Sequence, residues 1–596
     1  MSEIVNRRDL DFLLYEFLDL EALCRSPRYD AYDRVAVDEI LNAAQVIAED
    51  KFLSFAAKLD ATEPLFEGGK AICIPEVKEA LDAYAEAGFF AAGFDEDIGG
   101  LQMPNVLCLA MNGMFSCANH SVFGYSMLTT AAANMLDAFG SDEQKSVYLP
   151  PMLEGRWFGT MCLSEPQAGS SLSDIRTRAK PRADGSYSIS GTKMWISGGE
   201  QEISENIVHM VLAKIAGGPE GVKGISLFIV PKYRVNADGL PAEKNNIALA
   251  GLNHKMGQRG ITNTLLNFGE GGETQGFLVG EQHQGLRYMF HMMNEARIAV
   301  GHGAAVLGLA GYLYSLDYAQ HRLQGRHPQD KDPSSPQVPI VEHADIKRML
   351  LTQKAYVEGA LALVLYCAYL LDRQKTSDDV EAQKQLGLLL EILTPIAKSW
   401  PSEYCLEANK LAIQILGGYG YARDYPVERF YRDNRLNPIH EGSHGIQGID
   451  LLGRKVRIQD GAALKILAGK IKETIAEACE SEFADEAGVL GSALEELTRT
   501  TRTVLACNDI ALRLANATLY LDATGHIVIA WMWLKQALAV PRKIAGTHSD
   551  SAFYSGKHAA TRFFFRYELP KVFPNLKIVA SLDDTALNIT PKEFIG

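Results

Sequence analysis

One block of the sequence changes its hydrophobic periodicity, and this change constrains the fold more than any other feature. From Gly159 to about Val279 apolar and polar residues alternate and glycines punctuate the chain, as in 187–197, YSISGTKMWIS. Alternation with period two is typical of strands. The flanking segments carry apolar residues at helical spacing, as in 77–84, VKEALDAY. The sequence therefore predicts a mainly α-helical protein with a small β domain in the middle of the chain.

The same periodicity divides the chain into five segments. We predict an N-terminal helical extension (1–37), an α-helical domain (38–158), a middle β domain (159–280), a helical bundle (281–458) and an additional helical C-terminal domain (459–596). A Pro-rich polar loop at 325–339 interrupts the bundle, and a less regular tail follows about Leu538.

Charge and composition exclude several classes of protein. The 58 Lys and Arg and 73 Asp and Glu give a net charge of −15, which disfavours nucleic acid as a partner. The apolar runs 360–371 and 526–540 are shorter than the ~20 residues of a membrane span, and we expect both to form buried core helices. The acidic N-terminal segment does not resemble a signal peptide, and the nine cysteines form no CxxC pair. We expect a cytoplasmic protein.

Four short segments carry the residue types that a binding or catalytic site needs. They are 161–171 (MCLSEPQAGSS), 193–199 (KMWISGG), 414–421 (QILGGYGY) and 437–447 (NPIHEGSHGIQ). The first can aim hydroxyls and backbone N–H groups at a ligand, the second can stack a Trp on a planar cofactor, and the third lets backbone approach a pyrophosphate. The fourth holds Glu441, which would be a general base near neutral pH if it were desolvated. Taken singly, the four also fit a hairpin turn, a core Trp, a helix C-cap and a solvated surface acid.

The fourth segment also contains HExxH, the string of zinc proteases. That string binds zinc only on a helix, where both histidines share one face. Pro438, Gly442 and Gly445 disfavour a regular helix there, and no third ligand follows at a familiar spacing. We therefore predict no metal site.

Taken together and in this order, the segments CLSEPQAGSS, KMWIS, QILGGYGYARDYPVERFYRD and IHEGSHGIQ resemble the acyl-CoA dehydrogenase family over roughly residues 40 to 458. The N-terminal element RDLDFLLYEFL and the C-terminal extension resemble a larger bacterial subgroup, which includes fatty acyl-CoA and 3-methylmercaptopropionyl-CoA dehydrogenases. The fold implied is a helical domain, a β-barrel-like domain and a four-helix bundle, followed by the extra helical domain. The resemblance further implies bound FAD, an acyl-CoA substrate oxidised to the trans-2-enoyl-CoA, and at least a homodimer that shares FAD between subunits.

The resemblance also assigns roles to individual positions. Glu441 matches the base that removes the α-proton; relatives that place the base on the earlier helix do so at the position of Ala296, which cannot serve. The matched FAD contacts are Leu163, Ser164, Trp195, Ser197 and Ser443, with Arg322, Gln414, Gly417 and Gly418 reaching the FAD of a neighbouring subunit. The matched substrate contacts are Ser170, Asn294 and Arg297. Gly445 departs from a family Gln that touches FAD, and the loop 325–339 is longer than in short family members.

Three functions remain open on these grounds. The first is a dehydrogenase of medium- or long-chain fatty acyl-CoA in β-oxidation, with electron-transfer flavoprotein as acceptor; 3-methylmercaptopropionyl-CoA is the alternative substrate. The second is an acyl-CoA oxidase that uses O₂. The third is a non-enzymatic scaffold that retains the fold, which the presence of Glu441 disfavours.

Overall fold

A computed structural model describes residues 2–541 and 548–595, apart from the side chains of 290–293 and 548–549. The chain divides into two compact units. Residues Arg34–Ala296 form the first, which we call the sheet unit. Met1–Asp33 and Arg297–Gly596 together form the second, the helical unit. The N-terminal extension therefore packs with the later part of the chain rather than with the segment that follows it.

The sheet unit begins with helices and a small hairpin. The elements are α3 (Arg34–Ile47), η2 (Ala48–Leu53), α4 (Ala56–Ala61), β1 (Leu65–Glu67), β2 (Lys70–Ile72), α5 (Pro75–Glu86), α6 (Asn105–Ala118), α7 (His120–Phe139) and α8 (Asp142–Leu153). We predicted only helices for residues 38–158, but the structure also has the β1–β2 hairpin there. Its strands are three residues long and mostly exposed, so they carry little hydrophobic alternation.

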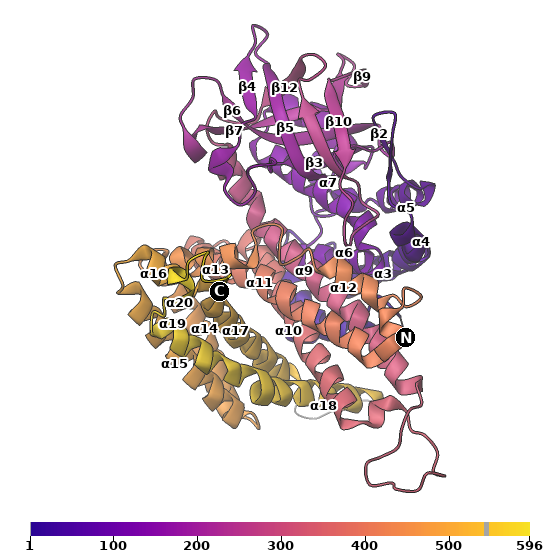
Figure 1. Cartoon of the computed structure of the whole chain (residues 1–596), viewed down its shortest axis with the longest axis vertical. Coiled ribbons are helices and arrows are strands. Elements are labelled where there is room, and N and C mark those ends of the chain that lie inside the picture. The colour runs from indigo at the N-terminus through magenta and orange to yellow at the C-terminus, as the bar shows by residue number, and fades with distance from the viewer. Residues whose placement is uncertain (1, 542–547, 596) are drawn as a thin grey trace. The chain divides into compact units, whose positions relative to one another are not determined.

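An eight-stranded sheet follows, in the order β10-β11-β5-β12-β7-β6-β3, with β4 pairing to β5 and β6 (Figure 1). Its strands are β3 (Trp157–Cys162), β4 (Arg178–Pro181), β5 (Tyr187–Ser197), β6 (Asn206–Ile215), β7 (Ile225–Pro231), β10 (Ile247–Leu252), β11 (Asn263–Phe268) and β12 (Thr274–Leu278); β8 (Tyr233–Val235) and β9 (Pro241–Lys244) form a separate hairpin. Trp157 and Met210 of the sheet pack with Leu136 of α7 and Leu149 of α8 in one buried cluster. This packing of helices on one side fixes which residues of the strands point away from the core.

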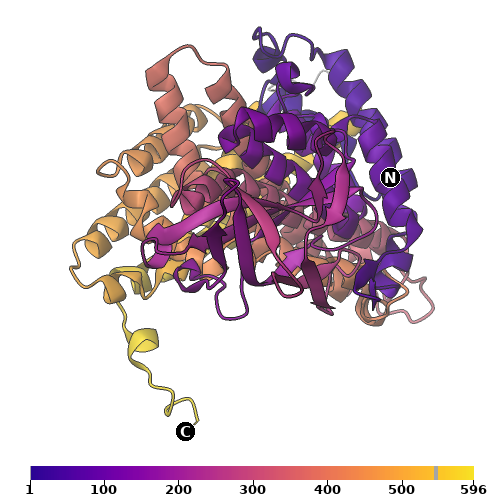
Figure 2. The same ribbon diagram turned by 90° about the horizontal axis from the view of Figure 1, so that it is seen from above.

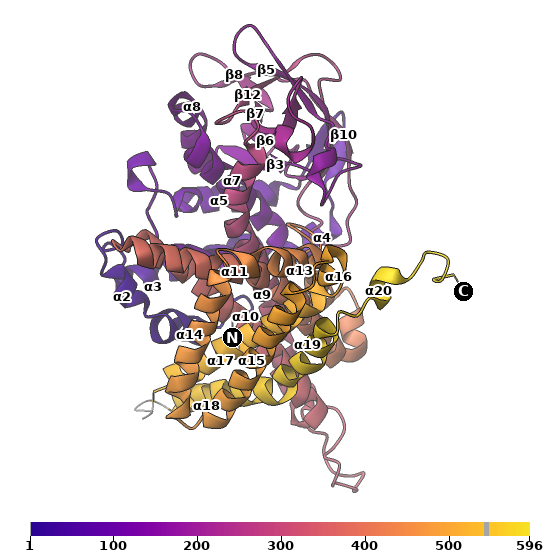
Figure 3. The same cartoon turned by 90° about the vertical axis from the view of Figure 1, so that its left-hand side faces the viewer.

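The helical unit contains a bundle and the additional C-terminal helices. Its elements are α1 (Arg7–Asp11), η1 (Phe12–Phe17), α2 (Leu20–Cys24), α9 (Gly285–His321, from Arg297 on), α10 (Ala344–Lys375), α11 (Val380–Leu416), α12 (Val427–Asn434), α13 (His444–Gly453), α14 (Ala462–Cys479), α15 (Ala484–Leu505), α16 (Ile510–Leu514), α17 (Ala517–Ala539), α18 (His548–Phe563), α19 (Val572–Ala580) and α20 (Thr585–Asn588). Helix α17 is buried along most of its length and contacts α10, α11, α13, α14, α15 and α19 (Figure 3). The C-terminal helices are thus continuous with the bundle core.

The structure differs from the expected irregular tail after Leu538. Helices α18 and α19 occupy most of the described part of this region, and the segment after α19 extends away from the helical unit (Figure 2). Pro570 lies in a short 3₁₀ turn and Pro574 in the first turn of α19, where a missing N–H costs no helical hydrogen bond. The prolines therefore mark helix boundaries here rather than irregular chain.

Helices α9 and α10 are long and apolar enough to cross a membrane, but 89% and 83% of their most apolar windows are buried within the protein. Such burial is typical of core helices in a bundle. The run 360–371 lies in α10 and 526–540 in and just after α17, and both are buried, as expected. Gly301 of α9 approaches α11 so closely that a Cβ would lie 1.8 Å from the carbonyl oxygen of Ala397. This contact brings α9 against the part of α11 that carries Lys398.

Candidate active site

The loop between α12 and α13 ends in two successive residues with left-handed backbone. Glu441 has φ 52° and Gly442 has φ 84°. Glycine adopts this conformation readily, whereas for Glu it is uncommon and carries strain. Such strain persists only where surrounding contacts hold it, and it is concentrated at functional sites. The backbone therefore marks Glu441 as a constrained position.

Two buried side chains hold this turn from neighbouring helices. Gln447 of α13 donates from Nε2 to the Glu441 carbonyl oxygen at 2.9 Å, and Lys398 of α11 donates from Nζ to the Gly442 carbonyl oxygen at 2.8 Å. Both side chains are buried. The sequence motifs gave neither residue a role. The available signal was a Lys inside the apolar run 390–400, LEILTPIAKSW, which is an unusual place for a solvated charge.

Charge and burial act on Glu441 in opposite directions. Burial raises the pKa of the Glu441 carboxyl, and the positive charges of Arg297 and Lys398 partly oppose the rise. Burial also lowers the pKa of Lys398 to about 8, although the negative charge of Glu441 resists this change. A carboxylate with less hydration and a raised pKa is a better proton acceptor at neutral pH than a surface carboxylate. The site thus has the electrostatics of a general base.

An ion pair with Asp450 fixes the Arg297 side chain. Its Nη1 donates to Asp450 Oδ2 at 2.9 Å, and its side chain is buried. Asp450 is also paired with Arg454, and hydrogen bonding to Arg454 keeps the Asp450 pKa low despite burial. Arg297 therefore supplies a permanent charge near Glu441. Its predicted contact with substrate stays a prediction.

The geometry of the loop does not suit the zinc-protease interpretation. Because Glu441 and Gly442 are left-handed, His440 and His444 do not lie on one face of a helix; His440 Nε2 instead contacts Asn437 Oδ1, and His444 begins α13. Ser443 occupies the N-cap of α13 and makes no side-chain capping bond.

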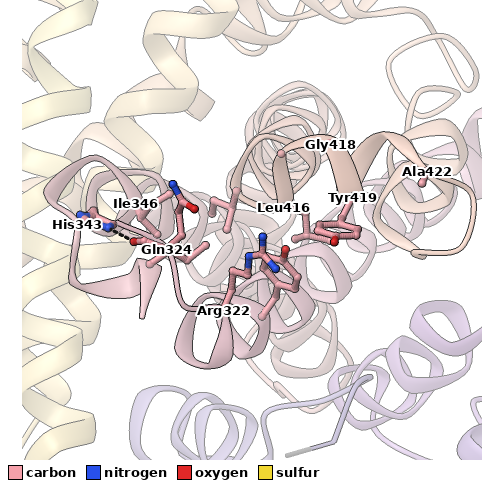
Figure 4. Close-up of a pocket in the computed structure, with 12 residues that line it drawn as sticks. Arg322, Gln324, His343, Ile346, Leu416, Gly418, Tyr419 and Ala422 are labelled. Atoms are coloured by element: carbon pink, nitrogen blue, oxygen red, sulfur yellow. Dashed lines mark hydrogen bonds between the residues drawn. The ribbon is translucent and has the colours of Figure 1, made fainter. Parts of the chain in front are cut away.

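A second set of predicted residues lines a pocket of about 660 Å³ in the helical unit (Figure 4). Arg322 follows the last turn of α9, and its guanidinium lies 5.3 Å from the ring centre of Tyr419. Gly417 and Gly418 follow the end of α11, and no atom lies within 4 Å of where their Cβ atoms would be. Gln414 does not line this pocket; its carbonyl accepts the Gly417 N–H that caps α11. The structure thus brings together three of the four residues predicted here.

The chemistry of this pocket fits part of a dinucleotide. Arg322 offers an exposed planar cation that can bind a phosphate oxygen pair. The open backbone at Gly417 and Gly418 leaves room for close approach of a pyrophosphate, and Ile340, Ile346 and Ile415 give an apolar surface. These residues would hold the phosphates and an adjoining aromatic group.

In the sheet unit, a β-bulge places Trp195 outside the core. Strand β5 pairs Ile196 with Thr264 and Lys193 with Leu266, so two residues of β5 oppose one residue of β11. Trp195 lies in this bulge with φ 66° and is 58% exposed. A core Trp is therefore excluded, and the indole face is available to stack on a planar group.

The predicted turn residues lie beside this strand. The Met194 N–H donates to the Ser164 carbonyl at 3.0 Å, and Lys193 Nζ donates to the Leu163 carbonyl at 2.9 Å. Ser197 Oγ accepts from Asn263 Nδ2 at 3.1 Å. Leu163, Ser164, Trp195 and Ser197 thus gather at one place in the sheet unit. Ser170 is exposed in the same turn, and Asn294 lies in the part of α9 that belongs to the sheet unit.

Glu165 holds the turn in shape, a role that sequence reasoning did not assign. Its carboxylate accepts the N–H groups of Arg176 and Thr177, the Thr177 hydroxyl and Lys193 Nζ. Burial opposes ionisation, but Lys193 and these hydrogen bonds outweigh it and lower the pKa of Glu165 to about 2. The pair Glu165–Lys193 therefore links the turn to the Trp195 strand.

Comparison with known proteins covers almost the whole chain. Residues 37–156, 160–270 and 283–456 match the profiles described as acyl-CoA dehydrogenase N-terminal, middle and C-terminal domains, and 467–590 match acetyl-CoA dehydrogenase C-terminal like. A 3-methylmercaptopropionyl-CoA dehydrogenase of Ruegeria pomeroyi is 34% identical over 91% of this chain and 93% of its own. The broad-specificity linear acyl-CoA dehydrogenase FadE5 of Mycobacterium tuberculosis is 32% identical over 99% of both chains. A crystal structure of an acyl-CoA dehydrogenase from Bacillus anthracis complexed with FAD has the same fold, with TM-score 0.73 and 21% identity over 98% of this chain and 95% of that one.

The chain belongs to the acyl-CoA dehydrogenase family, as the sequence motifs predicted. It is a flavin-dependent oxidoreductase of acyl-CoA thioesters, and FAD is the cofactor of this family. The predicted architecture of helical and β domains with an extra C-terminal helical domain is confirmed. The domain limits and the role of each site residue stay predictions.

Proposed function

We propose that this protein converts a saturated acyl-CoA to the trans-2-enoyl-CoA, with Glu441 as the base that removes the α-proton. The observation that supports this role most strongly is the combination at Glu441 of strained backbone, a half-buried position and a raised pKa. Bound FAD supplies the acceptor for the hydride that leaves the β-carbon. The α-proton leaves to the Glu441 carboxylate, and the pair of electrons from its C–H bond forms the new α,β double bond.

The chain's own residues prepare this step in three ways. The α-proton of a thioester is weakly acidic, so its carbonyl must be polarised; we assign part of this to the Glu441 backbone N–H. Lys398 and Gln447 fix the turn and thereby the direction of the Glu441 side chain. The neighbouring charges of Arg297 and Lys398 keep enough of the carboxyl ionised for it to accept a proton.

We further propose FAD contacts at two places. Leu163, Ser164, Trp195 and Ser197 would contact the isoalloxazine, and Ser443 would lie near it. Arg322, Gly417 and Gly418 would hold the diphosphate of a neighbouring subunit's FAD, with Gln414 close by, so the working form would be at least a homodimer. Sedimentation of the purified holoenzyme tests this; a monomer that retains FAD and full activity would contradict it.

For the substrate we propose a medium- or long-chain fatty acyl-CoA, oxidised in the cytoplasm during β-oxidation, with electron-transfer flavoprotein as acceptor. The relatives support two answers, since one acts on linear acyl-CoA broadly and the other on 3-methylmercaptopropionyl-CoA. Steady-state reduction of a dye across saturated acyl-CoA from short to long, with 3-methylmercaptopropionyl-CoA included, separates them. A maximum in kcat/KM at medium or long chains supports the proposal; a maximum at the methylthio substrate contradicts it. Rapid peroxide formation in air after anaerobic reduction would instead identify an oxidase.

A further inference from the structure

The side chain that follows the proposed base by three residues reaches into the additional C-terminal domain. His444 Nε2 lies 3.1 Å from Asp522 Oδ1, on helix α17. A carboxylate can only accept, so Nε2 carries the hydrogen and donates it. The other ring nitrogen, Nδ1, lies 2.9 Å from Ser399 Oγ and in this tautomer accepts the hydroxyl hydrogen. The imidazole is thus held at both ends.

Two adjacent residues of α11 contact the base loop, by which we mean residues 435–443 between α12 and α13, and the first residue of α13. Lys398 binds the Gly442 carbonyl and Ser399 binds the His444 ring. Both contacts come from helix α11 of the bundle. Asp522 supplies the contact from the C-terminal side, at a distance of 78 residues along the chain.

The backbones make the same connection. A Cβ on Gly448 of α13 would lie 2.8 Å from the Ala517 carbonyl oxygen at the start of α17. A Cβ on Gly525 of α17 would lie 2.5 Å from the indole of Trp400 in α11. Helix α17 therefore packs without a gap against the helix that follows the loop and against the helix that supports it. A shift of α17 would be transmitted to both.

The series Asp522–His444–Ser399 has the residue types of an acyl-transfer triad, but it cannot act as one. Ser399 is completely buried within α11. The Ser399 hydroxyl contacts Nδ1 of His444, and the Asp522 carboxylate contacts Nε2, so the two partners lie on different ring nitrogens, as in a triad. However, no substrate carbonyl can reach the buried Ser399 hydroxyl. Asp522 and Ser399 therefore have a structural role: they hold the His444 ring in place.

We infer that the additional C-terminal domain positions the catalytic base, with Asp522 acting through His444 as a positioning residue for Glu441. This inference rests on the proposed role of Glu441. It gives the C-terminal domain an indirect part in the chemistry, through the contact of Asp522 with the residue that begins the helix after the loop. Misplacing a reacting group by about 1 Å can cost on the order of a hundredfold in rate.

The test compares Asp522→Ala with Asp522→Asn, using the FAD-loaded full-length protein. We expect Asp522→Ala to lower kcat by about tenfold to a hundredfold with KM changed less than about twofold. Because the α-proton step becomes more rate-limiting, the isotope effect on kcat with 2,2-dideuterated acyl-CoA should rise. Asp522→Asn keeps an oxygen that accepts from His444 Nε2, so it should restore most of kcat. Glu495→Ala, an exposed acid in the same domain, is the matched control and should behave as the parent.

An unchanged isotope effect in Asp522→Ala overturns the inference, because a loss of folded protein lowers the active fraction without changing the rate-limiting step. If Asp522→Ala does not fold, the same measurement on His444→Leu decides the matter by the same criterion. Failure of the proposed function has a different signature. In that case Glu441→Gln would retain turnover, whatever the Asp522 variants do.

Discussion

Lys398 donates a hydrogen bond of 2.8 Å to the carbonyl of Gly442, the residue that follows Glu441. One buried ammonium therefore does two things at once: it holds the strained turn and places positive charge near the carboxylate. The same proximity that lowers the basicity of Glu441 also keeps it ionised. Lys398 thus supports the proposed base in two ways, through the backbone of the turn and through its charge.

Replacing Lys398 with Met should separate these effects from simple packing. The loss of positive charge removes a stabiliser of the carboxylate, so the pKa of Glu441 should rise further. Because the reaction needs the ionised form, the rising limb of the pH profile of kcat/KM should move to higher pH, and kcat should fall by roughly tenfold or more. Lys410→Met, on the exposed side of the same helix, should leave the profile in place. An unmoved limb in Lys398→Met would contradict the electrostatic role.

The turn should also respond to loss of Gln447. Its Nε2 is bonded to the Glu441 carbonyl, and its side chain is fully buried. Gln447→Met removes the donor and leaves a buried carbonyl without it, which should cost about 1–3 kcal/mol of stability. The left-handed turn should then lose part of its constraint, and kcat should fall more than the substrate affinity does. Parent-like kcat in a folded Gln447→Met protein would show that the Gln447 contact is not needed to hold the turn.

Retention of FAD should depend on Arg322. Hydrogen bonds to charged groups contribute about 1.5–3 kcal/mol, so Arg322→Ala should weaken FAD binding by roughly tenfold to a hundredfold. The measurement is the ratio of flavin to protein absorbance after gel filtration and dialysis. Arg348→Ala removes an exposed Arg of the same unit and serves as the control. Full retention by the Arg322 variant would disprove the contact.

The pair Glu165–Lys193 should make the sheet unit sensitive to acid. The pKa of Glu165 is lowered to about 2 when folded, whereas an unfolded Glu titrates near 4.3. A lowered folded pKa contributes stability above the unfolded pKa, and this contribution is lost as pH falls towards 2. The expected contribution is on the order of 3 kcal/mol.

Melting temperatures of the parent and Glu165→Gln should therefore differ at pH 6 and converge as the pH approaches 2. The exposed Glu220→Gln is the control and should follow the parent throughout. A constant difference between parent and Glu165→Gln across this range would show that the pair acts only through packing.

The sequence predicted much of this arrangement because the informative features are local. The alternation in 187–197 identified a strand, and the run IHEGSHGIQ identified the base loop. The bulge that turns Trp195 outwards could not be predicted, because it depends on how β5 and β11 align rather than on either strand alone. The same holds for Lys398, whose burial arises from packing of α11 against the base loop.

Asp522 illustrates the limit most clearly. In the sequence, Asp522 is an acidic residue within a mostly apolar segment. No neighbouring residue or motif indicates which side chain it would contact. Its contact with His444 exists only because α13 and α17 pack closely at Gly448. Pairings over such separations follow from tertiary packing, which neither periodicity nor motif spacing encodes.

The central claim is that Glu441 removes the α-proton. The most direct measurement is anaerobic stopped-flow reduction of the bound flavin by a saturated acyl-CoA in Glu441→Gln, a variant of the same shape without a basic carboxylate. We predict that this variant binds FAD and acyl-CoA as the parent does, while the rate of flavin reduction falls by about a hundredfold to ten-thousandfold. Flavin reduction at close to the parent rate would contradict the account.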